Sequence, residues 1–278
     1  DELEAVLAKW HSKKNLILQG PPGVGKTFLV HKLAYALIGA RAPERVQMVQ
    51  FHQSYSYEDF VQGLRPDPEA SGIFSLQDGV FHRFCRRAQD DLEQKYVFII
   101  DEINRGNLSQ IFGEMLMLIE ADKRSPDYAV PLVYMRANEE PFFVPSNVHI
   151  VGLMNLADRS LAMVDYALRR RFAFVRLQPQ FTLSLRAWLG QRRMDTALID
   201  RVISRMASLN AQIAADRQLG ENYAIGHSFF CPEGDDFSSL NGEWFKEIVD
   251  TEIAPLLEEY WFDDRARAVS AITALLAI

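Results

Sequence analysis

The chain has 278 residues, of which 48% are hydrophobic, and a formal net charge of −7 at pH 7. This length fits one large domain or two smaller ones with a sizeable core. The acidic balance argues against a surface that attracts nucleic acid generally, so any DNA contact must be local or belong to another domain. No apolar run approaches the roughly 20 residues that a membrane span requires.

The N-terminal stretch DELEAVLAKW lacks a signal-peptide pattern, and we expect a soluble, cytoplasmic protein without membrane contact. Residue 1 is Asp rather than Met, so we expect the numbering to begin inside a longer polypeptide. The two cysteines, Cys85 and Cys231, form no C-x-x-C motif, which favours free thiols in a reducing compartment. His82 and Cys85 have ligand-like spacing, but two ligands do not make a zinc site, and we predict no structural metal.

Apolar periodicity predicts the first elements of the chain. Leu3, Val6, Leu7 and Trp10 recur at helical spacing and indicate a short amphipathic helix. Continuous apolar runs then indicate strands buried on both faces, and helical patterns separate them, as in a three-layer α/β domain with a parallel sheet. The five runs cover residues 15–19, 46–52, 96–100, 149–154 and 172–177. The helical patterns cover residues 26–38, 80–93, 108–121 and 161–169.

Two segments interrupt this alternation and predict inserted β-hairpins. In residues 72–82 the dipeptide Asp78-Gly79 lies between apolar flanks, which is a hairpin signal. In residues 130–145 two apolar stretches flank the polar RANEE. Such hairpins either lie on the surface without a function of their own, or they contact a partner or the central pore of a ring.

After residue 181 the strand pattern stops and helical patterns take over. They cover residues 184–190, 195–215 and 243–260. We therefore predict two domains, an αβα nucleotide-binding domain over 1–180 and a helical lid over 181–278.

The segment GPPGVGKT, Gly20 to Thr27, matches G-x-x-x-x-G-K-[ST] in full and lies between a predicted strand and a predicted helix. Its glycines permit a tight path on which backbone N–H groups surround a phosphate, and the helix N-terminus adds partial positive charge. Lys26 is expected to reach the β- and γ-phosphates and Thr27 to offer its hydroxyl to Mg²⁺. The expected nucleotide contacts are Pro21, Pro22, Gly23, Val24, Gly25, Lys26, Thr27 and Phe28.

A second motif, YVFIIDEINR, ends an apolar strand on Asp101 and Glu102. Asp101 can hold Mg²⁺, and Glu102 can polarise the attacking water for in-line displacement. The alternative is that Glu102 only caps a helix. The paired carboxylates favour hydrolysis of a nucleoside triphosphate over transfer of its phosphoryl group to another substrate.

The stretch VGLMNLADRS, residues 151 to 160, carries Asn155 and Asp158 at the end of an apolar run. The N-x-x-D spacing is similar to a guanine-reading N-K-x-D motif, and the alternative is a role at the phosphates. Since the stretch follows the acidic strand by about fifty residues and precedes a helix with arginines, the phosphate role is favoured for Asn155. Asp158 and Arg159 then cap that helix or relay the nucleotide state.

With these motifs in this order, the chain resembles the AAA+ superfamily. The segments FHQSYSYEDFVQG, FIIDEINRGNLS, GLMNLADRSLAMVDYALRRRF and IAPLLEEYWFDD are similar to McrB proteins, the GTP-hydrolysing motor subunits of McrBC modification-dependent restriction systems. This resemblance covers essentially the whole chain as the family's motor domain. It implies a P-loop AAA+ αβα sandwich with a five-stranded parallel sheet and helical lid, assembled as a ring, typically a hexamer.

The resemblance also implies roles for single residues. Asn155 falls at the sensor position, where its amide orients the lytic water or contacts the γ-phosphate. Arg170 and Arg171 fall where AAA+ proteins present an arginine finger to the next subunit's nucleotide; the alternative is a solvated basic helix end. Arg105, three positions after Glu102, either faces the subunit boundary or is a surface residue.

Other candidates keep two interpretations. His227 lies roughly where AAA+ proteins place a second sensor, usually Arg, and a core or loop-stabilising role is the alternative. Tyr55 and Tyr57 either line the pore of a ring or pack the following helix.

The base and the partners follow from the resemblance and not from residue chemistry. It implies GTP with Mg²⁺, a homo-oligomeric ring, a separate McrC-like nuclease subunit, and DNA contact mainly through an N-terminal domain outside this sequence. The alternatives are an ATP-driven chaperone of the related MoxR group and a nucleotide-gated scaffold with little turnover.

Overall fold

The computed structural model describes residues 2–67, 72–136, 138–158 and 169–277. The chain divides into two compact units, which we call the sheet unit and the lid unit. The sheet unit comprises Asp1–Gln19, Thr27–Met154 and Arg159–Arg176. The lid unit comprises Gly20–Lys26, Asn155–Asp158 and Leu177–Ile278, so the phosphate loop groups with the C-terminal helices. No helix in the described ranges combines the length and the apolar character that crossing a bilayer would need.

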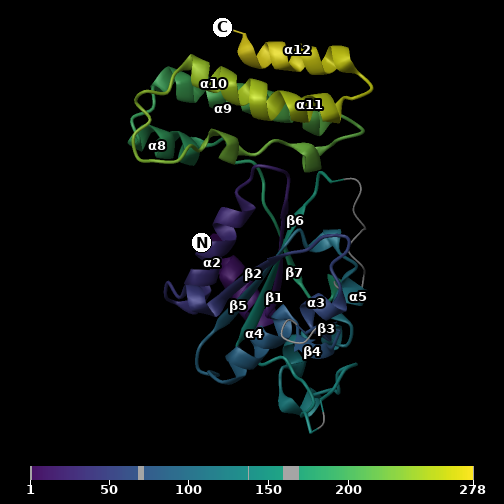
Figure 1. The fold of residues 1–278 in the computed structure, drawn as a ribbon. Coiled ribbons are helices and arrows are strands. Elements are labelled where there is room, and N and C mark those ends of the chain that lie inside the picture. Colours follow the sequence, from purple (N-terminus) through teal and green to yellow (C-terminus); the bar gives the residue numbers. More distant parts are fainter. Residues whose placement is uncertain (1, 68–71, 137, 159–168, 278) are drawn as a thin grey trace. The chain divides into compact units, whose positions relative to one another are not determined.

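The central sheet confirms the five predicted strands. They are β1 (Asn15–Gly20), β2 (Val46–Gln50), β5 (Tyr96–Asp101), β6 (Val148–Asn155) and β7 (Ala173–Arg176). Their order is β2-β5-β6-β1-β7, and the pairs β1–β7, β2–β5 and β5–β6 are parallel (Figure 1). Five of the six residues of β5 and seven of the eight of β6 are buried, which is why their sequences are continuously apolar.

Helices of the sheet unit follow the predicted periodicity with one correction. They are α1 (Glu2–Lys13), α2 (Lys26–Ile38), α3 (Tyr57–Phe60), α4 (Val80–Gln89), α5 (Leu108–Phe112) and α6 (Met115–Leu118). The single helix predicted over 108–121 is wrong, because Gly113 adopts a φ of +49° and separates α5 from α6. Short 3₁₀ turns complete the chain at Pro43–Arg45, Ile103–Arg105, Ala121–Lys123, Pro126–Tyr128, Glu221–Tyr223 and His227–Phe230.

An aromatic cluster joins α3, α4 and α5 to the sheet. The Phe60 ring stacks on Phe81 with centroids 4.8 Å apart and meets Phe98 edge to face at 5.7 Å. Phe112 lies 4.8 Å from the same ring, and all four side chains are fully buried. Rings in these arrangements contribute more than their buried area alone.

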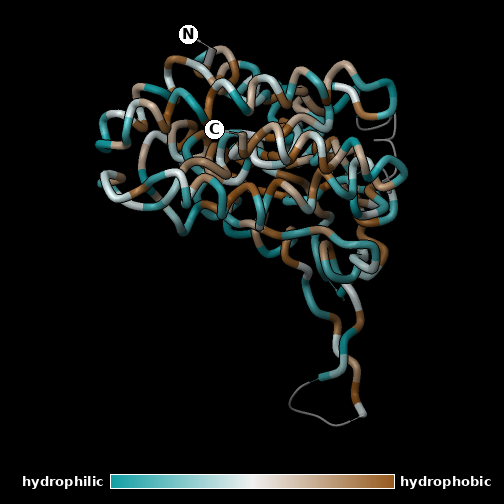
Figure 2. The backbone as a smooth tube through the Cα atoms, turned by 90° about the horizontal axis from the view of Figure 1, so that it is seen from above, coloured by the Kyte–Doolittle hydropathy of each residue, from teal (hydrophilic) through white to brown (hydrophobic). Residues whose placement is uncertain are grey.

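The first hairpin exists, but its predicted turn is wrong. Strands β3 (Gln62–Pro66) and β4 (Phe74–Asp78) pair antiparallel, and they form the two-stranded projection that leads to a grey segment in Figure 2. Asp78-Gly79 is instead the entry to α4. The Gly79 N–H donates to the Val61 carbonyl at 2.7 Å, and a Cβ on Gly79 would lie 2.3 Å from the Phe60 carbonyl carbon. The glycine is required there for a close backbone approach and not for a hairpin turn.

The second predicted hairpin is reduced to a single antiparallel bridge between Val130 and Phe142. Each residue's N–H donates to the other's carbonyl, at 2.9 and 2.8 Å. No strand is assigned to the described residues between 129 and 143, so two apolar flanks were not sufficient to extend the pairing.

The lid unit packs its helices around a separate apolar core (Figure 1). Its helices are α8 (Leu183–Gln191), α9 (Thr196–Ala215), α10 (Gly242–Ile248), α11 (Ala254–Tyr260) and α12 (Arg265–Leu276). The helix predicted over 243–260 is continuous in the structure, with a π-helical turn at Val249–Ile253 before Pro255. Such a turn accommodates the missing N–H of a proline inside a helix. Helix α12 was not predicted as a separate element.

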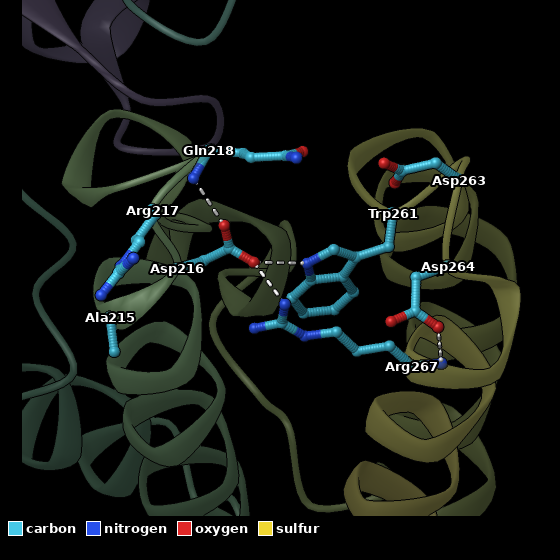
Figure 3. A pocket seen from close by; sticks show the side chains of 8 residues that line it. All are labelled: Ala215, Asp216, Arg217, Gln218, Trp261, Asp263, Asp264 and Arg267. Carbon is cyan, nitrogen blue, oxygen red and sulfur yellow. Dashed lines mark hydrogen bonds and ion pairs between the residues drawn. The ribbon is translucent and has the colours of Figure 1, made fainter.

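Asp216 ties the end of α9 to α12 beside a pocket of about 410 Å³ (Figure 3). Its Oδ2 accepts from Trp261 Nε1 at 3.0 Å and lies 2.6 Å from Arg267 Nη1, and its side chain is only 6% exposed. Oδ1 accepts the backbone N–H of Gln218 at 2.7 Å. The Trp261 hydrogen bond is the largest of the interactions that hold the Asp216 pKa below its ordinary value.

Replacing Asp216 by Asn is expected to lower the unfolding free energy of the lid by about 1–2 kcal/mol at pH 7. Because the folded pKa is depressed, this contribution is present above the unfolded pKa of about 3.9 and is lost as pH falls through the folded value. Urea unfolding followed by tryptophan fluorescence should therefore show the difference between wild type and variant narrowing below about pH 4. Asp263→Asn, at an exposed carboxylate in the same pocket, is the control. A difference that does not change with pH would contradict the prediction.

Candidate functional site

The phosphate loop leaves β1 at Gly20 and enters α2 at Lys26. Gly23 and Gly25 adopt φ values of +73° and +75°, which side-chain-bearing residues rarely adopt. Lys26 Nζ donates to the carbonyls of Gly20 and Pro21, both at 2.9 Å. The loop therefore follows a path that depends on glycine at both positions, as in loops whose backbone N–H groups surround a phosphate.

The remaining predicted nucleotide contacts divide between interior and surface. Pro21 and Val24 are buried, Pro22 is half-buried, and Thr27 is exposed at the start of α2. Phe28 is 71% exposed, with Lys32 Nζ 5.4 Å from its ring centroid. The predicted nucleotide contact Phe28 thus lies at the surface, in the first turn of α2.

The acidic pair ends β5, with Asp101 as its last residue. Asp101 Oδ1 accepts the Glu102 N–H at 3.0 Å. Glu102 adopts the left-handed conformation with φ +49° and ψ +44°, which is uncommon for a residue with a side chain and is concentrated at functional sites. Arg105 Nε lies 3.2 Å from Glu102 Oε2, so Arg105 faces the predicted catalytic carboxylate.

Asn155 ends β6, the strand between β5 and β1. Its Oδ1 accepts the N–H of Ala157 at 3.3 Å, and the next residue, Leu156, donates its N–H to the Gly20 carbonyl at 3.2 Å. Asp158 is half-buried. The helix predicted over 161–169 and the capping role of Arg159 lie largely outside the described residues, which resume at 169.

The phosphate loop rests on the lid segment Gly226–Phe230. The Gly226 N–H donates to the Pro22 carbonyl at 2.9 Å, and the Ser228 N–H to the Gly23 carbonyl at 2.8 Å. A Cβ on Gly226 would lie 1.9 Å from the Gly23 carbonyl carbon, so only glycine fits. The role of Gly226 was not predicted; its one signal in the sequence is the Gly-His pair within a long loop.

Replacing Gly226 by Ala is expected to weaken triphosphate binding at least tenfold, because the added Cβ overlaps the loop backbone that cradles the phosphates. Titration with a fluorescent triphosphate analogue measures this. Gly190→Ala is the matched control, because a Cβ there would meet nothing within 4 Å. Equal affinities for the two variants would contradict the prediction.

His227 supports the loop-stabilising interpretation. Its Nδ1 accepts the backbone N–H of Gln180 at 3.1 Å, which requires the neutral tautomer protonated at Nε2. Burial lowers its pKa below the ordinary value, which favours this neutral form. A residue that acts as an acceptor towards the backbone does not supply the positive charge of a sensor arginine.

The predicted arginines lie at the edge of the sheet where β1 begins, whereas the phosphate loop follows the end of β1. In the parallel register, Ala173 of β7 pairs with Leu16 near the start of β1. Arg171, two residues before Ala173, is 8% exposed and its Nη2 lies 2.8 Å from Glu120 Oε1. Arg170 is 69% exposed.

Tyr55 and Tyr57, for which a pore role and a packing role were both open, contact other side chains of the chain. Tyr57 is 9% exposed and its hydroxyl donates to Glu114 Oε1 at 2.6 Å. Tyr55 lies against Phe51 with ring centroids 4.7 Å apart. The packing interpretation is confirmed for Tyr57, and the pore interpretation for this side chain is wrong.

His82 belongs to a group of possible metal ligands in the described residues that does not include Cys85. Cys85 and Cys231 are free thiols. In the described part of the chain, His82 faces Asp78 and Glu139, and the three offer ligand atoms within 4.8 Å of one another. Arg136 lies 2.9 Å from an Asp78 oxygen and 3.3 Å from a Glu139 oxygen. Because a guanidinium already balances both carboxylates, we assign no metal ion to this cluster.

The fold and the loop together define a P-loop NTPase. A family model described as AAA domain (dynein-related subfamily) matches residues 15–172, and one described as McrB, alpha-helical lid domain matches residues 201–269. The first match covers more than half of the chain, which therefore belongs to the AAA family, and its lid is of the McrB type. The resemblance drawn from the motifs is confirmed.

Curated relatives agree with this assignment. The Type IV methyl-directed restriction enzyme EcoKMcrB subunit of Escherichia coli (strain K12) is 53% identical over 265 residues, which is 94% of this chain and 57% of the relative. The Type II restriction enzyme BsuMI component YdiS of Bacillus subtilis (strain 168) is 28% identical over 197 residues, or 59% of this chain and 57% of the relative. The chain thus spans a little over half the length of each. A solved structure from Cytophaga hutchinsonii covers 77% of this chain and 62% of its own at 11% identity and a TM-score of 0.40, too weak a likeness to bear on function.

Proposed function

We propose that this chain is a GTP-hydrolysing ring motor that powers DNA translocation for a separate McrC-like nuclease subunit in the restriction of modified DNA. One observation carries the proposal: a segment of a McrB-type lid holds the phosphate loop through two backbone hydrogen bonds. In addition, the strand that ends in Asp101 lies two places from β1 in the same sheet. The relative named as a subunit of a methyl-directed restriction enzyme supports the role in restriction. Contact with DNA is assigned mainly to a domain outside this sequence.

Hydrolysis is assigned to groups at the carboxyl ends of three neighbouring strands. The loop amides and Lys26 bind the phosphates, and Glu102 polarises the attacking water. Asn155 on β6, between β5 and β1, orients that water or contacts the γ-phosphate. Arg105 is held against Glu102 and is assigned to coupling the site to the subunit boundary.

Thr27 and Asp101 are proposed to hold Mg²⁺. The donor set fits this ion, because both residues offer oxygen atoms and Mg²⁺ prefers hard oxygen ligands. Thr27 is exposed at the start of α2, and Asp101 ends β5 with Oδ1 engaged by the Glu102 N–H, which leaves Oδ2 for the ion. An Mg²⁺ ion held by these two residues would neutralise negative charge that develops on the phosphates during hydrolysis.

The position of the arginines supports a ring in which neighbouring subunits complete each other's sites. Gly20 lies four residues beyond Leu16 along β1, roughly 13 Å at strand spacing, whereas Arg171 is held near the start of that strand. Arg170, the residue before Arg171, is therefore proposed to serve the nucleotide of the next subunit. A hexamer is the proposed state, by resemblance to the AAA+ superfamily.

Measuring hydrolysis of GTP and ATP over a range of protein concentrations tests the proposal. We expect preference for GTP, and turnover per chain that rises with protein concentration or on adding the nuclease subunit, because loop and arginine come from different chains. Clear preference for ATP would contradict the McrB-like activity. Turnover independent of concentration and partner would contradict the shared site.

A further inference from the structure

Glu120 connects the two candidate finger arginines. Its Oε1 lies 2.8 Å from Arg171 Nη2 and 3.5 Å from Arg170 Nη2. Its Oε2 lies 3.0 Å from Lys123 Nζ. Although burial opposes ionisation, the Lys123 hydrogen bond and the arginine charges hold the Glu120 pKa below its ordinary value, so the group is a carboxylate at neutral pH.

The backbone around this cluster is fixed by two buried side chains. Asn15 Nδ2 donates to the Ile119 carbonyl at 2.7 Å and to the Arg171 carbonyl at 3.0 Å. Arg124 donates to Asn15 Oδ1 at 2.7 Å and to the Ile119 carbonyl at 2.8 Å. Asn15 is fully buried and Arg124 is 5% exposed. Asn15, at the start of β1, therefore fixes the backbone of Ile119, which precedes Glu120, and the backbone of Arg171, whose side chain contacts Glu120.

The two arginines differ in how firmly they are held. Arg171 is 8% exposed, with the short contact to Glu120. Arg170 is 69% exposed and lies at the longer distance from the same oxygen. Exposed ion pairs contribute little to stability, so Arg170 can exchange this carboxylate for another anion. Removing the carboxylate would instead take away an acidic partner that lies 2.8 Å from the buried Arg171 guanidinium, which is costly.

We propose that Glu120 is a positioning residue that holds Arg171 within the fold and presents Arg170 to the triphosphate of the neighbouring subunit. This rests on the proposed ring NTPase. It assigns the trans-acting role to Arg170 and an anchoring role to Arg171. The carboxylate also orients the Arg170 side chain before it contacts the neighbour's phosphates. This reduces the conformational entropy that the side chain loses when it binds them.

The test is Glu120→Gln, which keeps size and removes charge, with Glu44→Gln, a 71% exposed carboxylate of the same unit, as the matched control. We expect Glu120→Gln to lower kcat at least tenfold at saturating protein, with triphosphate affinity unchanged, and Glu44→Gln to behave as wild type. Glu120→Asp, which restores the charge one methylene shorter, should recover part of kcat. If Glu120→Gln does not fold, Glu120→Asp still tests the proposal: its carboxylate is one methylene further from both arginines, so a kcat equal to that of wild type would contradict it.

Mixing experiments separate positioning from a general structural role. Mixed with Lys26→Ala subunits, which lack the phosphate-binding lysine but keep Arg170, the Glu120→Gln subunits should regain activity. Mixed with Arg170→Ala subunits they should not. Unchanged kcat, or recovery with Arg170→Ala, would overturn the role of Glu120. If Arg170→Ala itself is as active as wild type, the proposed trans finger fails instead, so the two failures are distinguishable.

Discussion

Replacing Glu102 by Gln is expected to lower triphosphate hydrolysis by about 10²–10⁴-fold while triphosphate binding is retained. The amide has the size of the carboxylate but cannot accept a proton from the attacking water. Folding should be little affected, because the substitution removes only an ion pair with Arg105, whose side chain is 43% exposed, and such pairs contribute about 0–1 kcal/mol. Phosphate release in steady state measures the rate, and retention of labelled triphosphate on the assembled protein measures the trapped state.

Glu44→Gln serves again as the control for removal of one carboxylate at an exposed site, and it should hydrolyse at the wild-type rate. A Glu102→Gln protein that turns over normally would contradict the assignment of Glu102 as the base. If wild type itself shows little turnover and Glu102→Gln leaves its behaviour unchanged, the chain is a nucleotide-gated scaffold and not a motor.

Replacing Arg170 by Ala is expected to lower turnover by about 10³-fold or more, the scale on which a trans-acting arginine contributes in GTPases. In the proposed role its guanidinium neutralises charge that develops on the transferred phosphoryl group, so binding of the triphosphate should change little. Arg169→Ala, at the adjacent exposed arginine, is the matched control and should keep most of the activity. Arg171→Ala should instead lower the melting temperature, because Arg171 is buried against Glu120.

Subunit mixing decides whether Arg170 acts in trans. Arg170→Ala subunits keep an intact phosphate loop, and Lys26→Ala subunits keep an intact arginine. Each alone should be inactive, and a mixture should recover activity at the interfaces where the two intact halves meet. The absence of recovery in rings shown to contain both subunits would mean that the arginine serves its own chain.

Local chemistry explains what could be predicted from the sequence. The phosphate loop is recognisable because its glycines, lysine and threonine act over eight consecutive residues from Gly20 to Thr27. The five sheet strands are recognisable because burial on both faces demands unbroken apolar runs, as in YVFII before Asp101. The class of protein and its nucleotide loop were therefore determined by the sequence alone.

Contacts between distant residues account for what the sequence left open. The dipeptide Asp78-Gly79 has the local sequence of a hairpin turn. In the structure the backbone of Phe60 and Val61 packs on Gly79, and helix α4 begins after this residue. Gly226 lies about two hundred residues from the loop it supports, and no periodicity joins them. In the same way, Asn15 and Glu120 have no local motif, because their roles depend on carbonyls and guanidinium groups that only the folded sheet brings together. The sequence determined which chemical groups follow the carboxyl ends of the strands; tertiary packing decided how the phosphate loop is supported and which of Arg170 and Arg171 is buried.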